Sequence, residues 1–103
     1  MSIELVQIVL LKFKQGVSPE DIDKFRHNLH SLGSKIPAIS AVKAGRVIRH
    51  PLDHGFDEGV IFVFKDEAAL KNDYIPHQAH RDYQAFSEPY IEDKLIFDIY
   101  SDE

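Results

Sequence analysis

The sequence predicts an α+β fold with the ferredoxin-like order of elements β-α-β-β-α-β. Two observations lead to this prediction. Four segments are dense in apolar, β-branched and aromatic residues, and stretches with helical character follow the first and third of them. The chain of 103 residues fits one domain, spanning residues 1–103, without a linker, an internal repeat or a low-complexity segment.

The first strand is predicted over residues 5–14, where apolar residues occupy both alternating faces. Val9 and Leu11 share one face with the polar Gln7, and the opposite face is also apolar. A sheet with one face in water would alternate apolar and polar residues, so this sheet is predicted to be covered on both faces. Two helices can cover only one face of four strands, and a second copy of the chain is the simplest partner for the other. The face predicted to meet that partner comprises Val6, Ile8 and Leu10.

The first helix is predicted to begin after Ser18, a good N-cap, with Pro19 at its first position. Asp21 lies three residues after the cap and approximates a capping box. Apolar residues then recur every three or four positions as far as Ile36. Gly33 is expected to fray or end the helix, and the proline after Ile36 prevents its continuation.

The second and third strands are predicted over residues 42–48 and 59–64, with Gly45 as the expected site of a bulge. Residues 50–55 between these strands are rich in turn formers and predict a loop.

A short helix capped by Asp66 is predicted to follow and to run towards Tyr74. Pro76 interrupts it, and a second helical stretch is predicted over residues 78–88. The last strand is predicted over residues 95–100.

Composition excludes several classes of function. Twelve Lys and Arg against seventeen Asp and Glu give a net charge of −5, without the basic patch of a nucleic-acid binder. The absence of cysteine excludes disulfides, thiol nucleophiles, cysteine–zinc sites and iron–sulfur clusters. The longest apolar run is far shorter than a membrane span, and no secretory signal is visible at the N-terminus. A cytoplasmic protein without nucleic-acid or membrane partners is therefore expected.

The densest group of chemically capable residues is Tyr74, His77 and His80, spaced by three and three around a proline. Histidine exchanges a proton near pH 7, and a buried phenol can donate a hydrogen bond to a developing oxyanion. A proline-broken helix entrance is also a place where such side chains can turn inward over a cavity. The alternative is that Tyr74 packs at the edge of the core while both histidines lie in solvent.

Other polar residues offer weaker candidates. Gln7 lies on an apolar strand face, so it either contributes a polar spot to a pocket or lies near water at a strand end. His50 and His54 fall in the loop without a recognisable metal-ligand spacing, and His27 and His30 flank the apolar stripe of the first helix. We therefore expect no tightly bound metal. No glycine-rich phosphate loop or dinucleotide motif is present, so no cofactor is expected.

The chain resembles the stress-responsive A/B barrel family (Dabb), whose members are dimeric α+β barrels. The resemblance rests on residues 8–14, 36–38, 74–80 and 95–98, which follow the family's order and spacing. The last two of these stretches are similar to the plant polyketide cyclase branch, which includes olivetolic acid cyclase.

This resemblance implies roles for individual residues. Tyr74 and His80 would be the acid–base pair for an intramolecular aldol cyclisation, with His77 close by. Gln7 takes the place of a histidine on the first strand of the cyclase. An amide cannot exchange protons, but Gln7 can still hydrogen-bond a substrate carbonyl or hydroxyl. The other positions implied to line the pocket are Val9, Leu11, Phe25, Leu29, Ile61, Val63, Tyr83, Phe86 and Ile91.

The sequence and the resemblance together predict a homodimeric, cofactor-free enzyme of the polyketide cyclase type. Its substrate would be a small, apolar, polyoxygenated chain or ring, bound between each sheet and its own helices. One alternative is a non-catalytic stress-response or ligand-binding dimer, in which the cavity is filled or merely binds. Another is a lyase acting on a cyanohydrin, with the same histidine as base. The discriminator is the volume of the cavity and whether His80 reaches it, and a filled cavity favours the non-catalytic protein.

Overall fold

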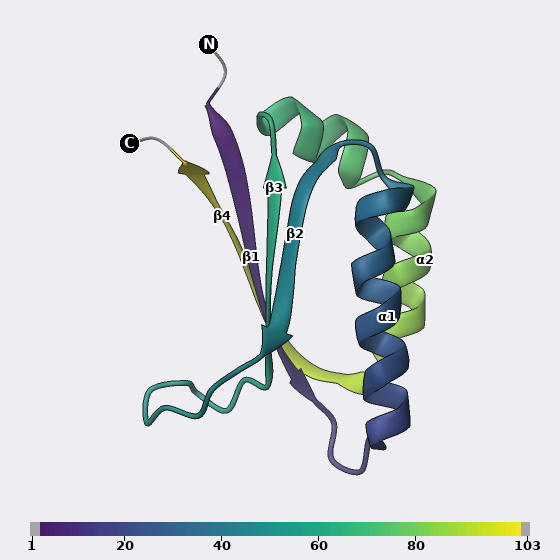
Figure 1. Cartoon of the computed structure of the whole chain (residues 1–103), viewed down its shortest axis with the longest axis vertical. Helices are drawn as coiled ribbons and strands as arrows, with labels where there is room; N and C mark the ends of the chain where they lie inside the picture. Colours follow the sequence, from purple (N-terminus) through teal and green to yellow (C-terminus); the bar gives the residue numbers. More distant parts are fainter. Residues whose placement is uncertain (1–2, 102–103) are drawn as a thin grey trace.

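The computed structural model describes residues 3–101, in which two helices lie on one face of a four-stranded antiparallel sheet (Figure 1). The strand order is β2-β3-β1-β4, and the predicted ferredoxin-like α+β fold is confirmed. The strands are β1 (Glu4–Phe13), β2 (Ile39–Arg46), β3 (Glu58–Phe64) and β4 (Ile91–Ser101). The helices are α1 (Pro19–Lys35) and α2 (Gln78–Ser87). Within the described residues, no helix is both long and apolar enough to cross a membrane.

The start of α1 is built as predicted, and the helix ends before the proline at position 37 as expected, but it is not broken at Gly33. The Ser18 hydroxyl accepts a hydrogen bond from the backbone N–H of Asp21 at 3.1 Å. The helix does not end at Gly33 but continues to Lys35. Gly33 lies close to β2: a Cβ added there would lie 3.3 Å from Cγ2 of Val42, so glycine lets the helix lie against the strand.

The second strand begins three residues earlier than predicted, at Ile39, and ends at Arg46. Its irregularity lies between Ile39 and Ala41 rather than at Gly45, which pairs regularly with Gly59. Ile39 and Val42 both pack on the core although their positions differ by an odd number. Because side chains alternate along a regular strand, one extra residue is needed to turn both of them inward.

Two short helical segments adjoin α2. Asp66 accepts the backbone N–H of Ala69 at 2.8 Å, as predicted for a cap, but the helix that follows is a π-helix, η1 (Ala69–Tyr74). Its wider turn is closed by the N–H of Ile75, which donates to the carbonyl of Leu70 at 3.0 Å. A 3₁₀ turn, η2 (Glu88–Tyr90), follows α2 and leads straight into β4, which therefore begins four residues before the predicted start.

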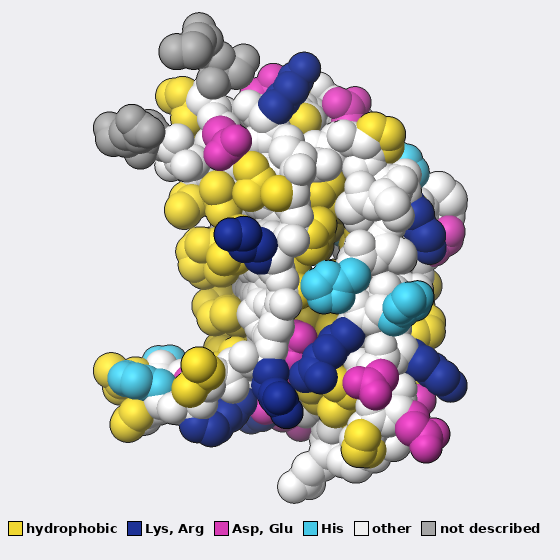
Figure 2. Space-filling view, in the orientation of Figure 1, with side chains coloured by type: hydrophobic (Ala, Val, Ile, Leu, Met, Phe, Trp, Pro, Cys, Tyr) yellow, Lys and Arg dark blue, Asp and Glu magenta, His cyan; other side chains and the backbone are white. Residues whose placement is uncertain are grey.

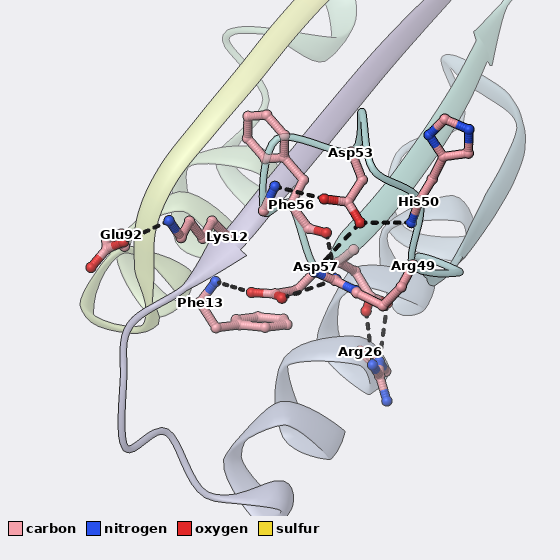
Figure 3. Close-up of polar contacts among 11 residues, drawn as sticks. Lys12, Phe13, Arg26, Arg49, His50, Asp53, Phe56, Asp57 and Glu92 are labelled. Carbon is pink, nitrogen blue, oxygen red and sulfur yellow. Dashed lines mark hydrogen bonds and ion pairs between the residues drawn. The ribbon is translucent and has the colours of Figure 1, made fainter.

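The core fills the space between the sheet and α1. Phe25 and Leu29 of α1 and Phe64 of β3 are fully buried there. At its lower edge the buried carboxylate of Glu58 accepts two hydrogen bonds from Arg26, at 3.0 and 2.8 Å. Figure 3 shows the contacts beside this pair, where Asp57 accepts the N–H of Phe13 and Arg49 reaches the same carboxylate from the loop. These contacts attach the β2–β3 loop to the end of β1.

The opposite face of the sheet is apolar and has no covering element among residues 3–101. Figure 2 shows hydrophobic side chains gathered on the side of the sheet turned away from the helices. Ile8 lies at its centre, between Ile61 of β3 and Phe97 of β4, which are 39% and 41% exposed. We call this surface the outer face; it comprises Val6, Ile8, Leu10, Ile61, Val63, Leu95, Phe97 and Ile99.

Candidate active site

A cavity of about 540 Å³ lies between the inner face of the sheet and α2. Its floor is formed by β1 and β3, where Gln7, Val9 and Phe62 contribute side chains. Tyr83 of α2 lines the opposite side. Charged residues of η2 and of the start of β4 also line the cavity, namely Glu88, Glu92, Asp93 and Lys94.

Tyr74 reaches this cavity from the last position of η1. Its ring is 2% exposed and packs on Phe64 and Phe62, with ring centroids 4.9 and 5.7 Å away. Burial raises the pKa of the Tyr74 hydroxyl well above its ordinary value of 10.0, and nearby Tyr83 and Asp98 raise it further. The raised pKa keeps this hydroxyl protonated, and it has no hydrogen-bond partner within residues 3–101, so it can donate to a bound molecule.

His80, in the first turn of α2, stacks on Tyr74 with a centroid distance of 4.2 Å and an interplanar angle of 33°. Its Nδ1 lies 3.0 Å from the carbonyl oxygen of Ile75. Because a carbonyl can only accept, this contact assigns the proton to Nδ1 and leaves a lone pair on Nε2. Burial lowers the pKa of His80 below 6.5, although the hydrogen bond to Ile75 opposes the shift. His80 is therefore a neutral base at pH 7.

Gln7 lies on the inner face of β1 and is 8% exposed. Its Nε2 donates to Oδ1 of Asp98 at 3.0 Å, and the two residues are directly opposite on β1 and β4. The NH₂ group of this buried amide thus has a hydrogen-bond partner. Sequence reasoning did not single out Asp98, although the sequence shows a lone carboxylate between the apolar Phe97 and Ile99 of the last strand.

The other pocket positions implied by the resemblance fall into two groups. Those that line the cavity are Val9, Leu11, Leu29, Tyr83 and Ile91. Ile61 and Val63 do not, because they project from the outer face, and their neighbours Val60 and Phe62 take the inner positions. Phe25 is enclosed in the core against Phe13 and Tyr83, and Phe86 packs on Tyr90, so neither ring lines the cavity.

The remaining histidines lie outside the cavity. His77, expected to bind substrate, is instead the N-cap of α2, where its Nδ1 accepts the N–H of Ala79 at 3.1 Å, and it does not line the cavity. His50 accepts the N–H of Leu52 in the loop, and His27 and His30 are exposed on α1. Among residues 3–101, no three side chains of His, Asp or Glu are grouped so that they could hold a metal ion.

Comparison with known proteins agrees with this architecture. The family model described as the stress-responsive A/B barrel domain matches residues 5–101. A hydroxynitrile lyase from Passiflora edulis superposes with a TM-score of 0.90 at 18% identity, over 100% of this chain and 97% of that one. A protein of Arabidopsis thaliana gives 0.88 at 24% identity, over 96% of both chains. A dimeric ferredoxin-like protein of unknown function from Thermobifida fusca gives 0.82 at 19%, over 97% and 92%. No curated protein matches the sequence. At these identities the structural likeness shows the fold alone.

Proposed function

We propose that this chain, which belongs to the stress-responsive A/B barrel domain family, is a small-molecule enzyme in which His80 is the general base and Tyr74 the oxyanion donor. The observation that carries the proposal is the stacking of the two rings beside one cavity, at 4.2 Å. The Nδ1–Ile75 hydrogen bond leaves the other nitrogen of His80 available to take a proton.

The favoured reaction is an intramolecular aldol cyclisation of the polyketide cyclase type. His80 Nε2 removes a proton from the carbon next to a carbonyl group, and the Tyr74 hydroxyl donates to the enolate oxygen that forms. The enolate carbon then attacks a second carbonyl of the same chain, and the new alkoxide regains the proton from His80. The apolar walls of the cavity hold the chain folded for this attack.

A cyanohydrin lyase is the second candidate, and the likeness to the Passiflora edulis hydroxynitrile lyase supports it. Here His80 would take the proton of the substrate hydroxyl while cyanide leaves and a carbonyl compound forms. Both candidates use the same base in the same cavity. They differ in the bond that breaks, so one pair of assays separates them.

The pH dependence of proton removal tests the proposal without a known natural substrate. We expect the protein to exchange the α-protons of 4-phenyl-2-butanone in D₂O, or else to cleave mandelonitrile, faster than buffer does. The rate should rise with pH to a plateau, with a midpoint below 6.5, because only neutral His80 is a base and burial lowers its pKa. Since the pKa of Tyr74 is raised, no falling limb is expected near neutral pH.

Proton NMR measures the exchange, and release of benzaldehyde measures the cleavage. If neither reaction is faster with the protein than in buffer alone at any pH, the proposal that the protein is an enzyme is contradicted. A non-catalytic ligand-binding protein would then be favoured. A midpoint above 6.5 would assign the proton transfer to a group other than His80.

We also propose that the outer face is covered by the outer face of a second copy. Its exposed apolar side chains favour a symmetric contact, and the Thermobifida fusca structure is of a dimeric protein.

Light scattering should give about twice the chain mass of 11.8 kDa. Ile8→Asp should give a monomer, because it would bury an unpaired charge at the centre of that contact. Ile75→Asp, at an exposed isoleucine outside the sheet, is the control and should stay dimeric. A monomeric wild-type chain would contradict the proposal.

A further inference from the structure

We propose that Gln7, oriented by Asp98, determines the specificity of the cavity and selects ligands that carry a hydroxyl group. The inference rests on the proposed function in one respect, that the substrate occupies this cavity. It concerns binding rather than turnover, so the two proposals can fail separately.

The contact with Asp98 fixes which way the Gln7 amide points. A carboxylate only accepts hydrogen bonds, so the NH₂ group of Gln7 must face Oδ1 of Asp98 across the 3.0 Å contact. A flip of the amide would place two acceptor oxygens against each other. The antiparallel pairing of Gln7 with Asp98 holds both backbones in place, so Asp98 acts as a positioning residue.

The amide oxygen of Gln7 is the unpaired atom of this group. Within residues 3–101, Oε1 has no hydrogen-bond partner, and no fully enclosed side-chain oxygen or nitrogen there lacks one. Oε1 is therefore not fully enclosed, and Gln7 lines the cavity although the residue is more than nine-tenths buried. A ligand that displaces water from this part of the floor must donate to Oε1 or leave it unpaired.

A hydroxyl group meets this requirement. It can donate to Oε1 and also accept from the remaining N–H of the amide, whereas an ether or a carbonyl oxygen can only accept. Val9 and Phe62 lie beside Gln7 on the floor, so the group attached to the hydroxyl should be apolar. Tyr74 offers a donor elsewhere in the cavity, and the preferred ligand therefore combines a hydroxyl with a carbonyl on one apolar frame.

The test compares 3-propylphenol with its methyl ether, 3-propylanisole, in ¹⁵N–¹H NMR titrations of the whole chain. We expect the phenol to bind at least about tenfold more tightly, because the ether leaves a buried acceptor unpaired. Gln7→Met should remove this preference, and Asp98→Asn should weaken it by freeing the amide to turn. Gln78→Met is the matched control: Gln78 donates to Asp82 at 2.8 Å in a similar pair on the exposed side of α2. This control should keep the full preference.

Equal affinities for the two probes, or no binding of the phenol, would overturn the proposal. So would a preference that survives Gln7→Met and disappears in His80→Ala, since His80 would then receive the hydroxyl. Should Gln7→Met fail to fold, the side-chain NH₂ signals of Gln7 in the unaltered protein decide: they should shift with the phenol and not with the ether. If the protein prefers the hydroxyl ligand but catalyses neither proton exchange nor cyanohydrin cleavage, the proposed enzymatic function is refuted. The inference about Gln7 then still holds.

Discussion

Replacing His80 with alanine is expected to lower the rate of proton exchange or cyanohydrin cleavage by about 10²–10⁴-fold, the usual contribution of a general base. The loss follows from the geometry, because the His80 ring stacks on Tyr74 beside the cavity and the Ile75 carbonyl, bonded to Nδ1, leaves Nε2 as the unprotonated nitrogen. The loss should appear in kcat rather than only in KM, since a base acts in the transition state. Steady-state kinetics of the purified variant measure it.

Two further variants show whether this loss is specific. His30→Ala removes an exposed histidine from α1 and should leave the rate unchanged. Tyr74→Phe keeps the buried ring and removes one hydrogen bond, so it should slow the reaction less than His80→Ala does. Circular dichroism and light scattering should show the same fold and association state throughout. Full activity in His80→Ala would remove the proposed mechanism.

Replacing Arg26 with methionine is expected to lower the free energy of unfolding by about 3 kcal/mol, the lower end of the range for breaking a buried ion pair. Glu58 is completely buried, and both of its carboxylate oxygens accept from Arg26. Without the guanidinium that carboxylate would be a buried charge without its partner. The lower end applies because the Arg26 side chain is 30% exposed, so water can reach the vacated position.

Urea denaturation at a fixed protein concentration measures this effect. The double variant Arg26→Met/Glu58→Met is the control, and it should be more stable than Arg26→Met alone because the buried charge is gone. A double variant that is no more stable than the single one would show that the cost lies in lost packing of the arginine stem and not in the unpaired carboxylate.

Much of the fold could be predicted from local patterns. The N-cap at Ser18 and the turn at Asp66 involve residues close in sequence, so the sequence contains the information needed to place them. The orientation of β3 could not be predicted in the same way. Residues 60–64 are apolar at every position, so alternation gives no sign of which face meets the core. This is why Ile61 and Val63 were expected in the pocket and lie on the outer face.

In the candidate site, too, the features that depend on nearby residues could be predicted and those that depend on long-range contacts could not. The pattern of Tyr74 and His80 around a proline pointed to a cavity that both residues do line. The π-helix that carries Tyr74, however, depends on tertiary packing of Leu70 and Tyr74 rather than on a local signal. Asp98 was missed because its partner Gln7 is 91 positions away, and only the pairing of β1 with β4 makes them neighbours.

That pairing has a consequence for how the protein is made. Of the four strands, β1 is translated first, and both of its neighbours in the sheet follow later, with β4 ending at Ser101. At synthesis rates of about 5–20 residues per second, both hydrogen-bonding edges of β1 stay unpaired for several seconds. The β2–β3 hairpin and α1 can form meanwhile, but the wall of the cavity that contains β4 cannot. A nascent chain therefore has no complete binding site until β4 has been translated, and during that interval β1 is a target for chaperones and for aggregation.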